Sequence, residues 1–184
     1  MPSKLAECGA HRRCRRQRRR DARHGGRAER QEEEAPVIFQ VLFYPSTNIS
    51  STDTKSYWEY GDGYSLTKKA IETFRSFYLP DREDWKNPEV SPLLTKDADL
   101  KFMPTTLIVT AGCDPLRDEG RHYADRLKSA GISVKYRLEE DMIHGILGLL
   151  GSPVYPDASK LAEQRLDTAV TVIRDGLGTV AEHK

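Results

Sequence analysis

The sequence has few cysteines, no long apolar run and almost no net charge. Its three cysteines, Cys8, Cys14 and Cys113, are too few and too unevenly spaced for a disulfide framework or a four-ligand zinc site. No apolar stretch approaches the roughly 20 residues that a membrane-spanning helix needs. The basic N-terminal residues also lack the apolar middle segment and the cleavage site of a secretory signal. We therefore expect a cytoplasmic protein with no membrane span and no metal, and its 184 residues suit about one domain.

The net charge of +1 conceals two parts of opposite charge. Residues 1–34 carry ten arginines and one lysine against six acids, a net +5, which leaves −4 for residues 35–184. Between Arg12 and Arg30 there is no aromatic residue, and the only aliphatic residues are alanines. Such a segment cannot bury enough apolar surface to offset the entropy of ordering it. We therefore divide the chain into an Arg-rich segment, residues 1–34, that is disordered or out of frame, and a globular part, residues 35–184.

Three interpretations of the Arg-rich segment are open. As an arm that binds RNA or DNA it would neutralise phosphates, although the lack of aromatic residues argues against sequence-specific recognition. As a solvated tail it would be the common outcome for a run of like charges. The third interpretation is genetic, because arginine codons of the CGN type become GNN codons for Ala, Gly, Val, Asp or Glu when read one base later. We favour a paired frame change bracketing residues 9–34.

The globular part alternates strand-like and helix-like segments. Residues 37–44 form a near-continuous apolar run, which is typical of a strand buried on both faces of a parallel sheet. Further strands are predicted over Thr105–Thr110 and Val134–Leu138, the latter nearer a sheet edge because charged residues alternate along it. Predicted helices cover Ser65–Tyr78, Arg117–Ala130 and Ser159–Arg174. Ser65 is the predicted cap of the first, and the three are stopped by Pro80, Gly131 and Gly176 in turn. This order predicts an α/β fold with a parallel sheet and right-handed crossovers.

Two residues with acid–base chemistry follow predicted strands. Asp114 comes after Thr105–Thr110, and His144 comes after Val134–Leu138. Catalytic groups of parallel α/β sheets lie beyond the carboxyl ends of the strands, and an acid about 30 residues before a histidine matches the order of an α/β-hydrolase triad. In such a triad the carboxylate fixes the imidazole tautomer, so that the other ring nitrogen takes a proton from a serine. We predict a hydrogen bond between Asp114 and Nδ1 of His144.

Each of these signals has an ordinary structural alternative. An aspartate before a proline is often a turn or cap residue, and a lone histidine often lies in a core with its hydrogen bonds satisfied. Asp118 and Glu119 are interpreted as first-turn acids favoured by the helix dipole. His122 and His183 are interpreted as structural or inert.

Several motifs that occur in one order carry a family resemblance. Cys113–Gly120 (CDPLRDEG), Tyr123–Leu127 (YADRL) and Met142–Gly145 (MIHG) resemble the C-terminal part of the hormone-sensitive-lipase-like esterases, also called bacterial family IV carboxylesterases. Further stretches that support the resemblance, which covers about residues 36–177, are Gln40–Pro45, Asn87–Leu93 and Leu107–Gly112. It implies the C-terminal half of an α/β-hydrolase sheet and hydrolysis of short-chain carboxylic esters without a cofactor. It also implies Asp114 as the triad acid and His144 as the general base.

The departures from the family pattern concern the nucleophile. The chain contains no Gly-x-Ser-x-Gly sequence, and the resemblance places the nucleophile at position 11, which is His11. The oxyanion motif of the family belongs upstream of the nucleophile, so His24-Gly25-Gly26 is interpreted as a coincidence. The first half of the domain has no counterpart. We therefore name no nucleophile and expect a truncated or frame-shifted chain that is catalytically incomplete.

Two strand edges predict that the chain associates with other copies of itself. Related esterases dimerise through the edge strand that corresponds to Val134–Leu138, which implies a possible homodimer through that strand. The strand Val37–Phe43 would have at best one further neighbour, and an unpaired apolar edge recruits other strands.

The Arg-rich segment leaves a competing function open. In that alternative the chain is a non-enzymatic protein that binds RNA or DNA through this segment.

Overall fold

The computed structural model describes residues 37–181 of the chain, with side chains described as far as residue 176. The Arg-rich segment 1–34, its predicted disorder and the frame-change interpretation lie outside the described residues. The described part contains strands β1 (Phe39–Phe43), β2 (Thr105–Cys113) and β3 (Val134–Ile143), which form one parallel sheet in the order β1-β2-β3. The predicted α/β fold with a parallel sheet is confirmed, and the strand beginning at Val134 does lie at an edge of the described sheet.

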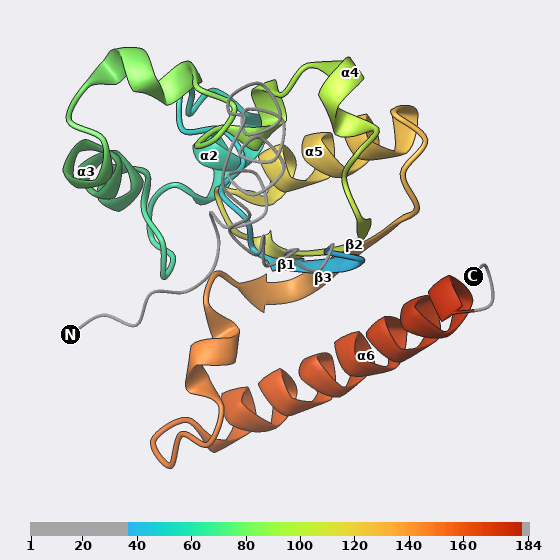
Figure 1. The fold of residues 1–184 in the computed structure, drawn as a ribbon. Coiled ribbons are helices and arrows are strands. Elements are labelled where there is room, and N and C mark those ends of the chain that lie inside the picture. Colours follow the sequence, from blue (N-terminus) through green and yellow to red (C-terminus); the bar gives the residue numbers. More distant parts are fainter. Residues whose placement is uncertain (1–36, 182–184) are drawn as a thin grey trace, which may run out of the picture. The chain divides into compact units, whose positions relative to one another are not determined.

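Helices cover both faces of this sheet. Figure 1 shows α6 (Pro156–Ala181) on one face and α5 (Arg117–Ser129) on the opposite face. The other helical segments are α2 (Lys55–Tyr60), α3 (Lys68–Tyr78), α4 (Asp97–Leu100) and three 3-10 segments, η1 (Arg82–Lys86), η2 (Pro92–Leu94) and η3 (Ile146–Leu149). The sheet is therefore the middle of three layers.

The middle strand β2 supplies the core on both of its faces. Leu107 and Val109 pack with Ala169 and Val172 of α6, whereas Ile108, between them, packs against α5. Successive side chains of a strand point to opposite faces, so an unbroken apolar run is what a strand covered on both sides requires. Burial of each large aliphatic side chain contributes about 1.5–3 kcal/mol. Packing on both faces therefore fixes the position of β2 and of Asp114, the residue that directly follows it.

Strands β2 and β3 approach each other closely at the end from which the site residues emerge. The register shifts between Ala111 and Cys113, so that Cys113 comes to pair with Ile143. A Cβ atom on Gly112 would lie 2.0 Å from the main-chain oxygen of Glu140, so only glycine fits there. Because the ladder resumes after this irregularity, β3 runs past its predicted end at Leu138 to Ile143. Strand β2 therefore ends at Cys113 and β3 ends at Ile143, and these two residues pair with each other.

Several helix boundaries differ from the predictions, among them the start of α6, which is Pro156 and not Ser159. The helix predicted to be capped by Ser65 begins at Lys68 instead, and the side chain of Thr67 caps it by accepting the N–H of Ala70 at 3.1 Å. The helix predicted to stop at Gly176 continues to Ala181. Gly176 is required for close approach, because a Cβ atom there would lie 2.6 Å from the ring of Phe39. This glycine therefore lets α6 lie against β1, a role that sequence alone does not distinguish from a helix stop.

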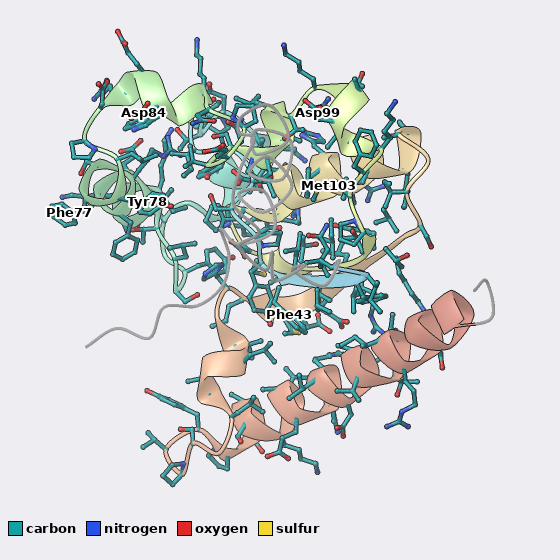
Figure 2. The ribbon with its side chains drawn as sticks, viewed as in Figure 1. Phe43, Phe77, Tyr78, Asp84, Asp99 and Met103 are labelled. Atoms are coloured by element: carbon teal, nitrogen blue, oxygen red, sulfur yellow. The ribbon has the colours of Figure 1, made fainter. Side chains whose placement is uncertain are left out.

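Some large apolar side chains stay exposed. Figure 2 shows Phe77 and Tyr78 projecting outward from α3, and both rings are more than half exposed. Val170 of α6 is also exposed, at 41%, whereas Ala169 and Val172 are buried. Within the described residues, no helix combines the length and the apolar character that crossing a membrane requires.

Candidate active site

Asp114 and His144 meet where β2 and β3 end. Asp114 directly follows Cys113 and His144 directly follows Ile143, and these two preceding residues pair across the sheet. Oδ2 of Asp114 lies 2.8 Å from Nδ1 of His144, which is the predicted contact on the predicted ring nitrogen. The carboxylate is fully buried, whereas the imidazole is 29% exposed. When Nδ1–H donates a hydrogen bond to the carboxylate, Nε2 of the neutral imidazole is left as a proton acceptor.

The second oxygen of Asp114 is held by the turn that leads into α5. Oδ1 accepts the N–H of Leu116 at 2.9 Å, and the main-chain oxygen of Asp114 accepts the N–H of Arg117 at 3.1 Å. Hydrogen bonds to an ionised carboxylate are shorter and stronger than those between neutral groups. Oδ1 therefore anchors the carboxylate to the turn, whereas Oδ2 faces the imidazole of His144.

The main chain around His144 is set by a glycine and a serine. Gly145 has φ +77°, a left-handed conformation that residues with a Cβ atom rarely adopt. The hydroxyl of Ser65 donates to the main-chain oxygen of His144 at 2.9 Å. Ser65 was predicted to cap a helix, and the structure shows instead that it ties a distant loop to the histidine. Its contact is with the main chain rather than the ring, so nothing here assigns it the role of nucleophile.

Glu119 does lie in the first turn of α5, as predicted, but its role in the tertiary structure was not predicted. Its side chain is only 1% exposed. Its Oε1 accepts the N–H groups of Thr47 at 2.6 Å and Asn48 at 3.1 Å, and its Oε2 accepts the hydroxyl of Tyr57 at 3.0 Å. Burial raises the pKa of Glu119 to about 7, against the effect of these hydrogen bonds. Helical periodicity was the available signal, since Glu119 and the buried Tyr123 are four residues apart and share a face.

Asp118 and Arg117 add hydrogen bonds that hold the loop carrying Asp114. Oδ2 of Asp118 accepts the N–H of Ser56 at 2.8 Å, and Oδ1 accepts Nε of Arg117 at 2.9 Å. Burial works against ionisation of Asp118, but the hydrogen bonds from Arg117 and Ser56 lower its pKa overall. Arg117 also donates to the main-chain oxygen of Gly112 at 3.1 Å, and the hydroxyl of Ser56 donates to that of Pro115 at 2.7 Å. The loop that carries Asp114 is therefore fastened on both sides.

His122 is not brought to this site, because it is exposed on α5. His11, the His24-Gly25-Gly26 stretch and His183 lie outside the described residues. Over residues 37–181, no cluster of three His, Cys, Asp or Glu side chains could hold a metal ion. The geometry thus offers an oriented imidazole and its carboxylate, which together can move a proton.

A family model described as the alpha/beta hydrolase fold matches residues 22–148. The chain belongs to this α/β-hydrolase family. The resemblance to hormone-sensitive-lipase-like carboxylesterases, and the assignment of the fold to part of an α/β-hydrolase domain, are confirmed.

The relatives are esterases that are considerably longer than this chain. Carboxylic ester hydrolase LipN of Mycobacterium tuberculosis is 41% identical over 113 residues, which is 61% of this chain and 29% of LipN. Carboxylesterase NlhH of the same species is 36% identical over 111 residues, covering 60% of this chain and 34% of NlhH. The ester-hydrolase EH1AB1 from the metagenome of Lake Arreo superposes with a TM-score of 0.65 at 34% identity, over 88% of this chain and 45% of that protein. The chain thus spans about a third of the length of the curated relatives it matches.

Proposed function

We propose that this chain carries the acid and the base of a serine carboxylesterase site that acts on small, short-chain esters. The observation that carries the proposal is the 2.8 Å contact between Oδ2 of Asp114 and Nδ1 of His144, at the ends of adjacent parallel strands. The esterase relatives described above support the same chemistry. Asp114 is the proposed positioning acid, and His144 is the proposed general base.

The proposed chemistry is acyl transfer through a serine. Nε2 of His144 takes the proton of a serine hydroxyl while the serine oxygen attacks the ester carbonyl, and Asp114 stabilises the imidazolium that forms. The imidazolium then returns its proton to the departing alcohol, which leaves an acyl-serine. A water molecule, activated by the same imidazole, hydrolyses the acyl-serine to the carboxylic acid and restores the serine. Every proton in this cycle passes through Nε2 of His144, so the proposed mechanism requires that nitrogen to face the serine.

The sequence offers no recognisable motif for the serine nucleophile or for the oxyanion donors. It contains no Gly-x-Ser-x-Gly sequence. When the members of a triad are removed, only the residual catalysis of the oxyanion hole and of binding remains. We therefore expect little or no ester turnover by the chain alone.

A chimera tests the proposal. The N-terminal part of LipN, up to the residue that aligns with Val37, is joined to residues 38–184 of this chain, and hydrolysis of p-nitrophenyl butyrate is followed. Turnover is expected in the chimera. Asp114→Asn and His144→Gln should each lower kcat by at least about 10³-fold with little change in KM, because both groups act in the transition state.

His122→Gln and Asp125→Asn are matched controls, since both side chains are exposed on α5. These controls should stay within about twofold of the chimera. A folded, active chimera that keeps its kcat after His144→Gln would contradict the proposal. Salt-sensitive retention of RNA by the original chain, combined with an inactive but folded chimera, would favour the nucleic-acid-binding alternative.

We also propose a homodimer through the outer edge of β3, because β3 pairs with β2 alone among the described strands. An open parallel edge leaves main-chain N–H and C=O groups available for pairing. Sedimentation velocity over a concentration series should show a dimer at tens of micromolar. A single monomeric species over that range would refute the dimer. The cytoplasmic location stays a prediction.

A further inference from the structure

Tyr44, the residue after β1, departs from the alternation of its strand. Leu42 packs on the α5 side of the sheet, and Phe43 packs on the α6 side, where Figure 2 labels it. Continued alternation would return Tyr44 to the α5 side. Instead, Tyr44 joins the same cluster as Phe43, together with Ala111 and Met142.

The backbone conformation of Tyr44 causes this departure. Its φ is +48°, and it is the one residue other than glycine with a positive φ in the described chain. This conformation is unfavourable for a bulky residue, and strained residues concentrate at functional sites. The N–H of Tyr44 still donates to the main-chain oxygen of Val109 at 2.8 Å, so the backbone stays attached to β2 while the side chain changes face.

The change of face brings the aromatic ring to the histidine. The ring centroids of Tyr44 and His144 lie 5.6 Å apart, and the ring planes are inclined by 57°. This separation lies within the range of favourable aromatic pairs. The ring of Tyr44 is 8% exposed, so it is a fixed neighbour of the partly exposed imidazole.

The hydroxyl of Tyr44 does not account for the arrangement. Over the described residues it is buried with no hydrogen-bond partner. Burial, with the charges of Asp114 and Glu139, raises the pKa of this phenol, which keeps it neutral at physiological pH. The ring rather than the hydroxyl is therefore the part of Tyr44 that serves the site.

We propose that Tyr44 is a positioning residue for His144, and that its left-handed backbone turns the ring onto the imidazole so that Nδ1 stays directed at Asp114. The proposal rests on the proposed function only in that it takes His144 as the general base. Ring pairs of this kind are worth about 0.5–1.5 kcal/mol, which corresponds to a preference of roughly 2- to 10-fold for the held orientation. Loss of the ring should change the tautomer and the orientation of His144, whereas loss of the hydroxyl should not.

Nuclear magnetic resonance of the chain labelled with ¹⁵N-histidine tests the proposal without any ester turnover. The ring nitrogens of His144 are assigned with His144→Gln and should show the Nδ1–H tautomer. Tyr44→Phe should retain it. Tyr44→Leu should lower the ratio of the Nδ1–H to the Nε2–H tautomer by roughly 2- to 10-fold. Tyr123→Leu, which removes a buried ring of α5 that belongs to another cluster, is the matched control and should leave the ratio unchanged.

A Tyr44→Leu variant that keeps the native amide spectrum and the original tautomer ratio would overturn the proposal. If Tyr44→Leu does not fold, nuclear Overhauser contacts between the two rings in the original chain decide. Their presence, with the tautomer retained in Tyr44→Phe, supports the proposal, and their absence in the folded chain overturns it. Because no ester is involved, this result is independent of whether the LipN chimera is active.

Discussion

The buried carboxyl of Glu119 should make the stability of the fold depend on pH in an unusual direction. Its pKa is about 7 in the folded state, against an ordinary value of 4.5, because burial disfavours the charged form. Between pH 4.5 and 7 the folded chain holds a proton that the unfolded chain has released. The free energy of unfolding therefore falls as the pH rises through this window. The contribution is complete below pH 4.5 and is lost above pH 7.

The size of the effect follows from the shift. Each pKa unit corresponds to 1.36 kcal/mol, so the full contribution of Glu119 is about 3 kcal/mol. Glu119→Gln keeps an oxygen that can accept from Thr47 and Asn48, but it cannot titrate. At pH 4.5 this variant should therefore lie within about 1 kcal/mol of the original chain. At pH 8 it should have gained about 3 kcal/mol relative to the original chain.

Urea denaturation at pH 4.5, 6 and 8 measures this difference. Glu72→Gln, an exposed substitution on α3, is the matched control and should follow the original chain at each pH. Glu119→Ala should be destabilised by about 3 kcal/mol or more at every pH, because it leaves two main-chain donors and the Tyr57 hydroxyl without their acceptor. The reasoning is refuted if the pH dependence of Glu119→Gln coincides with that of the original chain.

Three further predictions concern packing and the coding sequence. Tyr44→Phe should leave the free energy of unfolding unchanged or raise it by up to about 1 kcal/mol in urea denaturation, because it removes a buried hydroxyl without a partner; a loss above about 2 kcal/mol would contradict this. Gly120→Ala should lower the free energy of unfolding by about 1–3 kcal/mol, because a Cβ atom there would lie 2.8 Å from Cγ2 of Thr110. Gly148→Ala, with open space around it, is the control and should lower it far less. Equal losses in the two variants would show that close packing is not the cause. The DNA encoding residues 9–34, read in an alternative frame, should specify a helix rich in Ala, Gly and Val, and stop codons or charged sequence in both other frames would exclude a frame change.

Much of the fold follows from local patterns in the sequence. The apolar runs of 37–44 and Thr105–Thr110 predict strands because a parallel strand is buried on both faces. Proline and glycine positions predict several helix ends, as Gly131 does after α5, where φ is +84°. Asp114 and His144 were identified because each follows a strand and because the surrounding motif resembles that of an esterase family. Such features depend on neighbours in the sequence, so sequence alone determines them.

Tertiary structure decided the features that depend on contacts between distant segments. Glu119 became a buried acceptor because the loop after β1 passes over it, about 70 residues away in sequence. Ser65 reaches the main chain of His144 across 79 residues. Asp114 and His144 meet where β2 and β3 pair again after the irregularity at Gly112. The positive φ of Tyr44 belongs to the same class, since the surrounding packing holds a conformation that tyrosine itself disfavours. Residue preferences are local, whereas burial and hydrogen-bond partners are set by which surfaces meet, and so these features emerge only when the chain is folded.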